Sequence, residues 1–248
     1  MNIDVIIPFH SGTNHLIGCL KALGNGPRLN GVVYLVDDAS PSDEAARARA
    51  PVAELQLPIE WIRLNERRGF VEAINTAWRL TRQPFALILN NDTVPAAGLL
   101  SKLCSFLEQN SEVAAVAPTS DNPNDLYQYR APQRRVGEAR AGVFWRFKWA
   151  PYLTAMCLAV RRKAIDGPLF DSVYSPGYFE DLDLCCRLRA GGWRLAILED
   201  CVVRHVGRAT FGSDPKLPDL LARNYATFSE RWAHLPEHRE LDRLLQSV

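Results

Sequence analysis

The sequence has little that would bind nucleic acid, cross a lipid bilayer or form disulfides. Its 29 lysine and arginine residues nearly cancel its 28 aspartate and glutamate residues, so an anionic ligand needs a local site. No apolar run approaches the ~20 residues that cross a bilayer, and no signal-peptide pattern precedes the strand-like residues at Ile3. The six cysteines show no CxxC spacing, which favours reduced thiols. We expect a cytoplasmic protein, at most peripheral to the inner face of a membrane, with no nucleic-acid partner.

The length and the pattern of the first third predict one α/β domain. A chain of 248 residues with 47% hydrophobic residues can bury a single large core. Between Ile3 and Asp92, short β-branched runs alternate with helical patterns, which is typical of βαβ units and a parallel sheet. Such sheets bind ligands at the carboxyl ends of their strands. We expect strands at 3–7, 31–37, 59–64 and 85–90, and helices at 14–23, 42–50, 70–80 and about 95–110.

The second half of the chain is less regular. Residues 121–140 are rich in Asn, Pro, Gln and Arg without a clear period, which predicts a long surface loop that acts as a substrate lid. An apolar stretch at 152–160 precedes a helix over 180–190, which Gly191 and Gly192 end, and a strand over 193–198. The tail over 217–245 has an amphipathic helical pattern. No repeat or linker divides the chain, so we expect no second independent domain.

Acids and amides follow two of the predicted strands. Asp37 and Asp38 come directly after one strand, where a carboxylate can accept hydrogen bonds from a ribose hydroxyl or a base N–H. Asn90, Asn91 and Asp92 follow another, and a carboxylate there suits the hard cations Mg²⁺ or Mn²⁺. Each group taken alone is also explained by a turn that caps the next helix. Two such groups at one edge of a sheet favour a ligand site.

A third acidic group and a histidine lie later in the chain. Glu180 and Asp181 fall in the first turn of a predicted helix, where the helix dipole favours negative charge. Asp183 has the spacing to pair with Arg187 one turn later, which is a structural role. His205 follows a strand-like run, and a neutral imidazole there is either a metal ligand or a satisfied structural histidine.

These motifs occur along the chain in a fixed order. They are Val5-Ile-Ile-Pro8-Phe-His10, Val36-Asp37-Asp38-Ala39-Ser40, Asn65 to Gly69-Phe70, Asn75, Asn90-Asn91-Asp92, Phe179-Glu180-Asp181-Leu-Asp183 with Arg187 and Gly192-Trp193, and His205. In this order, over about residues 2–212, the chain resembles the family 2 inverting glycosyltransferases of the GT-A fold. It departs from the family at Asn90, which stands in place of the first Asp of the metal-binding Asp-x-Asp motif and leaves Asp92 as its charged ligand.

The resemblance implies a fold and a division of the chain. The fold is α/β, a single GT-A domain with a Rossmann-like, mostly parallel central sheet and helices on both faces. Residues 1–212 would be the catalytic domain, with a nucleotide-binding half over about 1–95 and an acceptor half over about 96–212. Residues 213–248 would form a helical C-terminal extension packed on the same domain.

The resemblance also implies roles for named residues. Asp181 would be the general base and Glu180 a helper that orients hydroxyl groups, while Asp92 and His205 would bind Mn²⁺ or Mg²⁺. The donor, a nucleoside diphosphate sugar, would be held by Pro8, His10, Asp37, Asp38, Asn65, Arg68, Gly69, Asn75 and Asn91.

The implied reaction is transfer of a hexosyl or deoxyhexosyl group to an acceptor hydroxyl with inversion. The setting that the resemblance implies is bacterial polysaccharide or glycolipid assembly, with a saccharide or lipid-linked saccharide acceptor. A nucleotidyltransferase is one alternative, but it favours a basic Gly-rich loop after the first strand, and no Lys or Arg occurs before Lys21. A non-catalytic nucleotide-sugar-binding module is the other, favoured by Asn90 in the metal motif. Sugar-nucleotide hydrolysis with and without Mn²⁺ separates binding from turnover.

Overall fold

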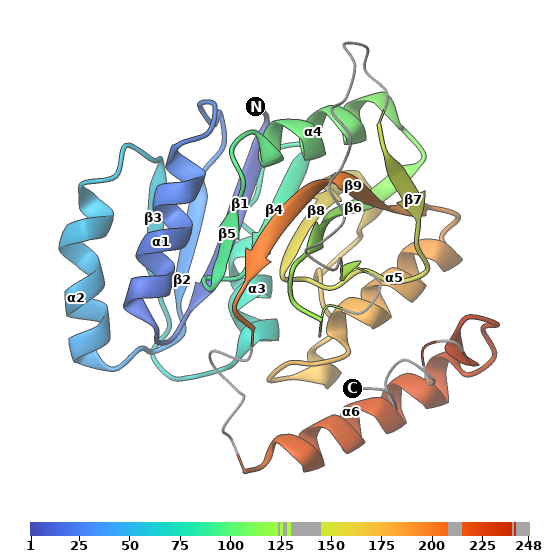
Figure 1. The fold of residues 1–248 in the computed structure, drawn as a ribbon. Helices are drawn as coiled ribbons and strands as arrows, with labels where there is room; N and C mark the ends of the chain where they lie inside the picture. The colour runs from blue at the N-terminus through green and yellow to red at the C-terminus, as the bar shows by residue number, and fades with distance from the viewer. Residues whose placement is uncertain (124, 126–127, 130–144, 208–214, 240, 242–248) are drawn as a thin grey trace.

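A nine-stranded sheet forms the centre of the protein (Figure 1). The structure is a computed structural model that describes residues 1–123, 125, 128–129, 145–207, 215–239 and 241. The order of strands is β3-β2-β1-β4-β8-β6-β9-β5, and β7 also pairs with β9. Among the described residues, no helix has the length and apolar character needed to span a membrane.

The first four long strands and their connecting helices form the predicted βαβ units. β1 pairs in parallel with β2 and β4, and β2 pairs in parallel with β3. The carboxyl ends of these strands therefore lie at one edge. The elements are β1 (Ile3–Phe9), α1 (Thr13–Gly24), β2 (Val33–Asp37), α2 (Ser42–Ala53), β3 (Ile59–Arg63), α3 (Phe70–Trp78) and β4 (Phe85–Leu89).

The second half adds five strands and three α-helices. Because β8 runs antiparallel to both β4 and β6, while β9 runs parallel to β6, the strands β1, β2, β3, β4, β6 and β9 share one direction. β5, β7 and β8 run the other way, so the sheet is mostly parallel, as predicted. The elements are β5 (Thr93–Pro95), α4 (Leu99–Gln109), β6 (Val113–Ser120), β7 (Phe147–Trp149), β8 (Cys157–Arg161), the 3₁₀ turns η2 (Arg162–Ala164) and η3 (Ser172–Tyr174), α5 (Glu180–Ala190), β9 (Arg194–His205) and α6 (Leu217–Trp232).

Two apolar layers cover the two faces of the sheet. Alternation along β1 places Ile6 in one layer, while Val5 and Ile7 lie in the other. The layer of Ile6 includes side chains of α3, α5 and α6, and the opposite layer includes side chains of α1, α2 and α4. Helices on both faces of a central sheet confirm the predicted fold class.

Two predicted elements in the second half need correction, and one long strand was not predicted. β9 does not end at residue 198 but continues to His205, past a shift in its register against β6 at Pro118. α6 ends at Trp232 rather than at 245, because Pro236 lacks the N–H that a continuing helix needs and restricts the residue before it. β6 was not predicted at all. Most of the predicted lid at 121–140 lies outside the described residues.

Candidate active site at the carboxyl ends of the strands

Asp37, at the end of β2, is held by protein groups. Its carboxylate is fully buried. One oxygen accepts a hydrogen bond from the Ser40 backbone N–H at 2.8 Å, and the other accepts from the guanidinium of Arg63 and, at 3.4 Å, from the indole of Trp61. The parallel register explains this, since Asp37 lies opposite Arg63 of β3. Asp37 therefore stabilises the end of the sheet.

Asp38 connects the end of β2 to the loop before α3. Its two oxygens accept hydrogen bonds from the backbone N–H groups of Arg68 and Gly69 at 2.6 and 2.8 Å. Its backbone carbonyl accepts one from Nδ1 of His10 at 2.7 Å. The side chain of Arg68 is exposed and pairs at the surface with Glu66. Asp38 thus brings four of the predicted donor-binding positions, including its own, to one edge of the sheet.

The other predicted donor-binding positions are placed differently. Pro8 is half-buried near the end of β1, and Asn65 is exposed at the start of the same loop. Asn75 is buried in α3 and does not lie at the strand ends. Its amide donates to the carbonyl of Phe170 at 2.8 Å and accepts from the N–H of Phe170 at 3.0 Å. Asn75 therefore joins α3 to the segment before η3, and its hydrogen-bonding atoms have protein partners.

Asn90, Asn91 and Asp92 follow β4 and differ in their hydrogen bonds. Asn91 donates to the carbonyl of Ser11 at 3.0 Å, whereas Oδ1 of Asn90 is buried without a partner among the described groups. Thr93, the residue after Asp92, pairs with His205 and so joins β5 to β9. This pairing places Asp92 beside the end of β9, where one of its oxygens accepts from the backbone N–H of Gly207 at 3.1 Å.

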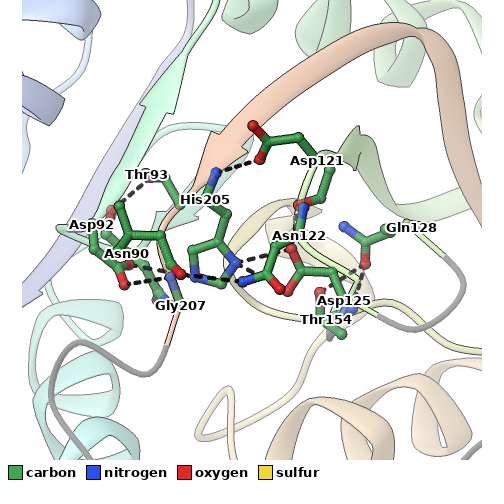
Figure 2. A network of polar contacts seen from close by, with 12 residues as sticks. Asn90, Asp92, Thr93, Asp121, Asn122, Asp125, Gln128, Thr154, His205 and Gly207 are labelled. Atoms are coloured by element: carbon green, nitrogen blue, oxygen red, sulfur yellow. Dashed lines mark hydrogen bonds and ion pairs between the residues drawn. The ribbon is translucent and has the colours of Figure 1, made fainter. Parts of the chain in front are cut away.

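His205 lies between two carboxylates (Figure 2). Its Nε2 is 3.4 Å from Oδ1 of Asp92, and its Nδ1 is 2.9 and 3.0 Å from the two oxygens of Asp125. Burial lowers the pKa of His205, but hydrogen bonds and charge from Asp125 and Asp92 outweigh it and raise that pKa to about 9. The structure thus brings together Asp92 and His205, the two residues that the resemblance implies as metal ligands.

Asp125 was not predicted, because it lies in the polar segment that we interpreted as a loop. It accepts a hydrogen bond from the hydroxyl of Ser120 at the end of β6, and its backbone carbonyl accepts from the N–H of Gln128 at 2.9 Å. Gln128 is fully buried, and its amide oxygen accepts from the N–H of Thr154 at 2.5 Å. This polar network extends from His205 to Thr154, in the segment before β8 (Figure 2).

The pair Asp92 and His205 fits a divalent cation that also binds the donor. Two ligands on one ion at bond lengths of about 2.1 Å lie about 3 Å apart, close to the 3.4 Å between Nε2 and Oδ1. An acid on the far nitrogen, as Asp125 is here, keeps a proton on Nδ1, so Nε2 would be the nitrogen that gives up its proton and binds the metal. Among the described residues, no group of three or more His, Cys, Asp or Glu side chains is arranged to hold a metal, so substrate oxygens and water would complete the shell.

Glu180 and Asp181 begin α5 and differ in environment. Asp181 accepts hydrogen bonds from the backbone N–H groups of Ala155 and Leu182 at 3.0 and 2.8 Å. Burial raises its pKa to about 6 although these bonds oppose the shift. Glu180 is buried with one carboxyl oxygen unpartnered among the described groups. Burial, and next the charge of Asp181, raise the pKa of Glu180 well above its usual range.

The two acids differ in their hydrogen bonds. The N–H groups of Ala155 and Leu182 favour the charged form of Asp181, which can accept a proton, while burial and the charge of Asp181 favour the protonated form of Glu180, which can donate a hydrogen bond. Asp183 takes a third role. It pairs with Arg187 at 2.8 Å and accepts from the indole of Trp232 at 2.9 Å, which confirms the predicted structural pairing.

Comparisons with known proteins agree with this fold. The profile described as "Glycosyl transferase family 2" matches residues 4–167, and a comparison with curated proteins finds no match. The mannosyltransferase PcManGT from Pyrobaculum calidifontis, in complex with GDP-Man and Mn²⁺, is 20% identical with a TM-score of 0.68, over 91% of this chain and 63% of that one. GalNAc-T7 with UDP, GalNAc and Mn²⁺ is 14% identical with a TM-score of 0.70, over 95% and 48%.

A third solved structure, S. aureus TarS 1-349 in complex with UDP-GlcNAc, is 15% identical with a TM-score of 0.63, over 92% of this chain and 66% of that one. The chain thus spans about half to two thirds of the length of these three structures. Because these sequences are 20% identical or less to this chain, the similarity shows a shared fold only.

Proposed function

This chain belongs to glycosyl transferase family 2 and has the GT-A fold, and from that premise we propose that it transfers a sugar from a nucleoside diphosphate donor to an acceptor hydroxyl with inversion. The observation that carries the proposal is the carboxylate of Asp181, which has a pKa of about 6 and lies beside a more basic Glu180. The matched segment ends at residue 167, before both acids. Their roles therefore rest on geometry and charge.

In the proposed mechanism, Asp181 removes the proton of the acceptor hydroxyl as its oxygen attacks the anomeric carbon. A base whose pKa lies just below the working pH is ionised and still accepts a proton readily. Glu180, whose protonated form burial favours, donates a hydrogen bond to the acceptor or the sugar. Asp181 thus acts as the base, and Glu180 orients the substrate.

At the leaving group, Asp92 and His205 would hold Mn²⁺ or Mg²⁺, as ligands that the 3.4 Å spacing of their atoms favours. Such an ion supplies positive charge for the departing diphosphate. Asp125 fixes the imidazole of His205 through Nδ1. The free Oδ1 of Asn90 takes a donor hydroxyl as its hydrogen-bond partner.

For the donor, we propose contacts from the residues at the strand ends. Asp37 and Asp38 act chiefly by holding these residues in place, since all their carboxylate oxygens already accept protein N–H bonds. Asn75 does not contact the donor in this proposal, because its amide is bonded to the backbone of Phe170. The contacting residues are Pro8, His10, Asn65, Arg68, Gly69 and Asn91.

One feature of α1 disfavours the nucleotidyltransferase alternative. Phosphate at such a site would bind the N–H groups at the start of the first helix. Here the carboxylate of Glu44 accepts the N–H of Thr13 at 3.0 Å and its hydroxyl at 2.5 Å. An anion already occupies that helix end and repels a second one. The non-catalytic module is disfavoured by Asp181, because a binding protein has no need of a carboxylate poised near neutral pH.

The substrates are proposed by analogy with the similar structures. PcManGT holds GDP-Man and TarS holds UDP-GlcNAc, so a nucleoside diphosphate hexose is the proposed donor, and a saccharide or lipid-linked saccharide is the proposed acceptor. We further propose a role in bacterial polysaccharide or glycolipid assembly at the cytoplasmic side of the membrane. Residues 1–212 would be the catalytic unit, and 213–248 an extension that includes α6.

A donor panel tests the proposal directly. The chain is incubated with nucleoside diphosphate hexoses, with and without Mn²⁺, and both nucleoside diphosphate release and transfer to oligosaccharide acceptors are measured. NMR of the product reports whether the anomeric configuration is inverted. Tight donor binding without release or transfer under any condition would instead support the binding module.

A further inference from the structure

The backbone directly before the two acids is held in an unfavourable conformation. Tyr178 and Phe179 both have positive φ angles, of 73° and 71°, in the left-handed region that residues with a Cβ rarely occupy. Phe179 is also the residue from which α5 begins. The direction in which Glu180 and Asp181 leave this segment therefore depends on whatever stabilises these two residues.

Asn224 of α6 supplies that stabilisation. Its side chain is completely buried, and its Nδ2 lies 3.1, 2.8 and 2.9 Å from the carbonyl oxygens of Tyr174, Gly177 and Tyr178. Its Oδ1 accepts from Nε of Arg223 at 3.0 Å. The two amide hydrogens are thus shared among three carbonyls of the segment that leads into α5.

Other contacts hold α6 against the same segment. Arg223 also donates to the carbonyl of Ser175 at 2.5 Å. The ring of Phe179 packs on Phe228 of α6 with 5.7 Å between ring centroids. Trp232, at the end of α6, donates to Asp183 inside α5 at 2.9 Å. α6 therefore contacts the approach to α5 and α5 itself, and Figure 1 shows the two helices beside one another.

We propose that Asn224 is a positioning residue for the carboxylate pair, which acts by holding the backbone from Tyr174 to Phe179 in the conformation that aims Glu180 and Asp181 at the acceptor. It acts through the backbone and does not contact the substrate. Its effect on turnover rests on the proposed function, whereas its effect on the backbone does not.

Asn224→Asp tests the inference with no change in side-chain size. It removes both N–H donors and places an anion against three carbonyls. We expect the turnover number to fall by about tenfold or more, since small misplacement of reacting groups costs up to about 10²-fold. The donor KM should change less than the turnover number, because the proposed donor contacts come from β1 and from the loops after β1, β3 and β4. Hydrogen exchange of the amides at 178–182 should become faster.

Two further variants keep the comparison interpretable. Asn224→Ala removes the same donors without adding charge, and it replaces Asn224→Asp if that variant does not fold. Ala226→Asp adds the same charge on the exposed side of α6 and should leave turnover and exchange unchanged.

The outcomes separate the inference from the proposed function. Unchanged turnover and unchanged exchange at 178–182 in both folded Asn224 variants would overturn the inference, and so would an equal effect of Ala226→Asp. If the wild-type chain transfers no sugar from any donor, the proposed function fails. The exchange measurement then decides by itself whether Asn224 holds this segment.

Discussion

Nε2 of His205 lies 3.4 Å from Oδ1 of Asp92, although the two residues belong to distant parts of the sequence. The short antiparallel pair β5 and β9 brings them together, because Thr93 lies opposite His205. The last residues of β9 therefore belong to the site as much as the triplet after β4 does.

The first prediction concerns Asp92. Asp92→Asn replaces a charged oxygen ligand by a neutral amide, so Mn²⁺ should no longer strengthen the binding of nucleoside diphosphate. Calorimetric titrations with and without Mn²⁺ measure this effect. Asp43→Asn removes the same charge from an exposed position on α2 and should bind as the wild type does. Undiminished Mn²⁺ dependence in Asp92→Asn would show that the metal, if bound, uses other ligands.

The second prediction concerns Asp125, whose carboxylate bonds Nδ1 of the imidazole and not the Nε2 that faces Asp92. Loss of such an outer partner typically weakens a metal site by about 10–100-fold, so we expect Asp125→Asn to raise the Mn²⁺ dissociation constant by that order. Electron paramagnetic resonance of free Mn²⁺ measures it. Asp121→Asn is the matched control, since Asp121 bonds the backbone N–H of His205 and not its ring. If both variants lost Mn²⁺ affinity equally, Asp125 would not act through the imidazole ring.

Much of the fold could be predicted because its signals are local. The alternation of β-branched runs with helical patterns located β1 to β4, and α5 begins and ends where the sequence predicted. β6 was missed because its residues do not favour a strand: it contains three alanines and Pro118. All eight of its residues are buried. Packing on both faces of the sheet therefore stabilises this strand, although its residues have little intrinsic preference for one.

The partners of the site residues were harder to predict, since they depend on register and long-range packing. Asp37 was expected to face the donor, but the parallel register sets Arg63 opposite it. Asp125 and Gln128 carry no signal in a segment of polar residues, and their contacts with His205 and Thr154 exist only once β6, β8 and β9 are aligned. The acids themselves were found from the order of motifs, because that order needs no knowledge of contacts.

The third prediction concerns Gly69, where the loop held by Asp38 meets the segment before α5. Its φ is 87°, and an added Cβ would lie 2.3 Å from Cβ and 2.6 Å from the carbonyl oxygen of Pro176. Gly192 also has a positive φ, of 82°, but open space around it. Gly192→Ala should therefore cost only the conformational penalty of about 1–2 kcal/mol. Gly69→Ala should cost about 1–3 kcal/mol more in the free energy of unfolding, because the backbone must also move.

Urea denaturation of the two glycine variants measures this difference. Equal losses of stability would mean that the contact with Pro176 relaxes at no cost.

The fourth prediction is the pH dependence of turnover. The active form of Asp181 is the carboxylate, and burial raises its pKa to about 6. Turnover should therefore be constant above about pH 7 and fall about tenfold per pH unit below pH 6. The measurement is made at saturating donor and Mn²⁺, so that proton competition at His205 does not limit the rate. A profile that stays flat down to pH 4.5 would exclude a base with a raised pKa.

The last prediction separates the two acids at the start of α5. Asp181→Asn keeps the size of the side chain but cannot accept the proton, and loss of a general base costs about 10²–10⁴-fold in rate. Donor affinity should hardly change, because the carboxylate bonds Ala155 and Leu182 rather than the residues at the strand ends. Glu180→Gln should be milder, since burial and the charge of Asp181 favour the protonated form of Glu180, and glutamine has a similar shape and also donates a hydrogen bond. Single-turnover rates with matched donor titrations compare the two variants, and a larger loss in Glu180→Gln would assign the base to Glu180 instead.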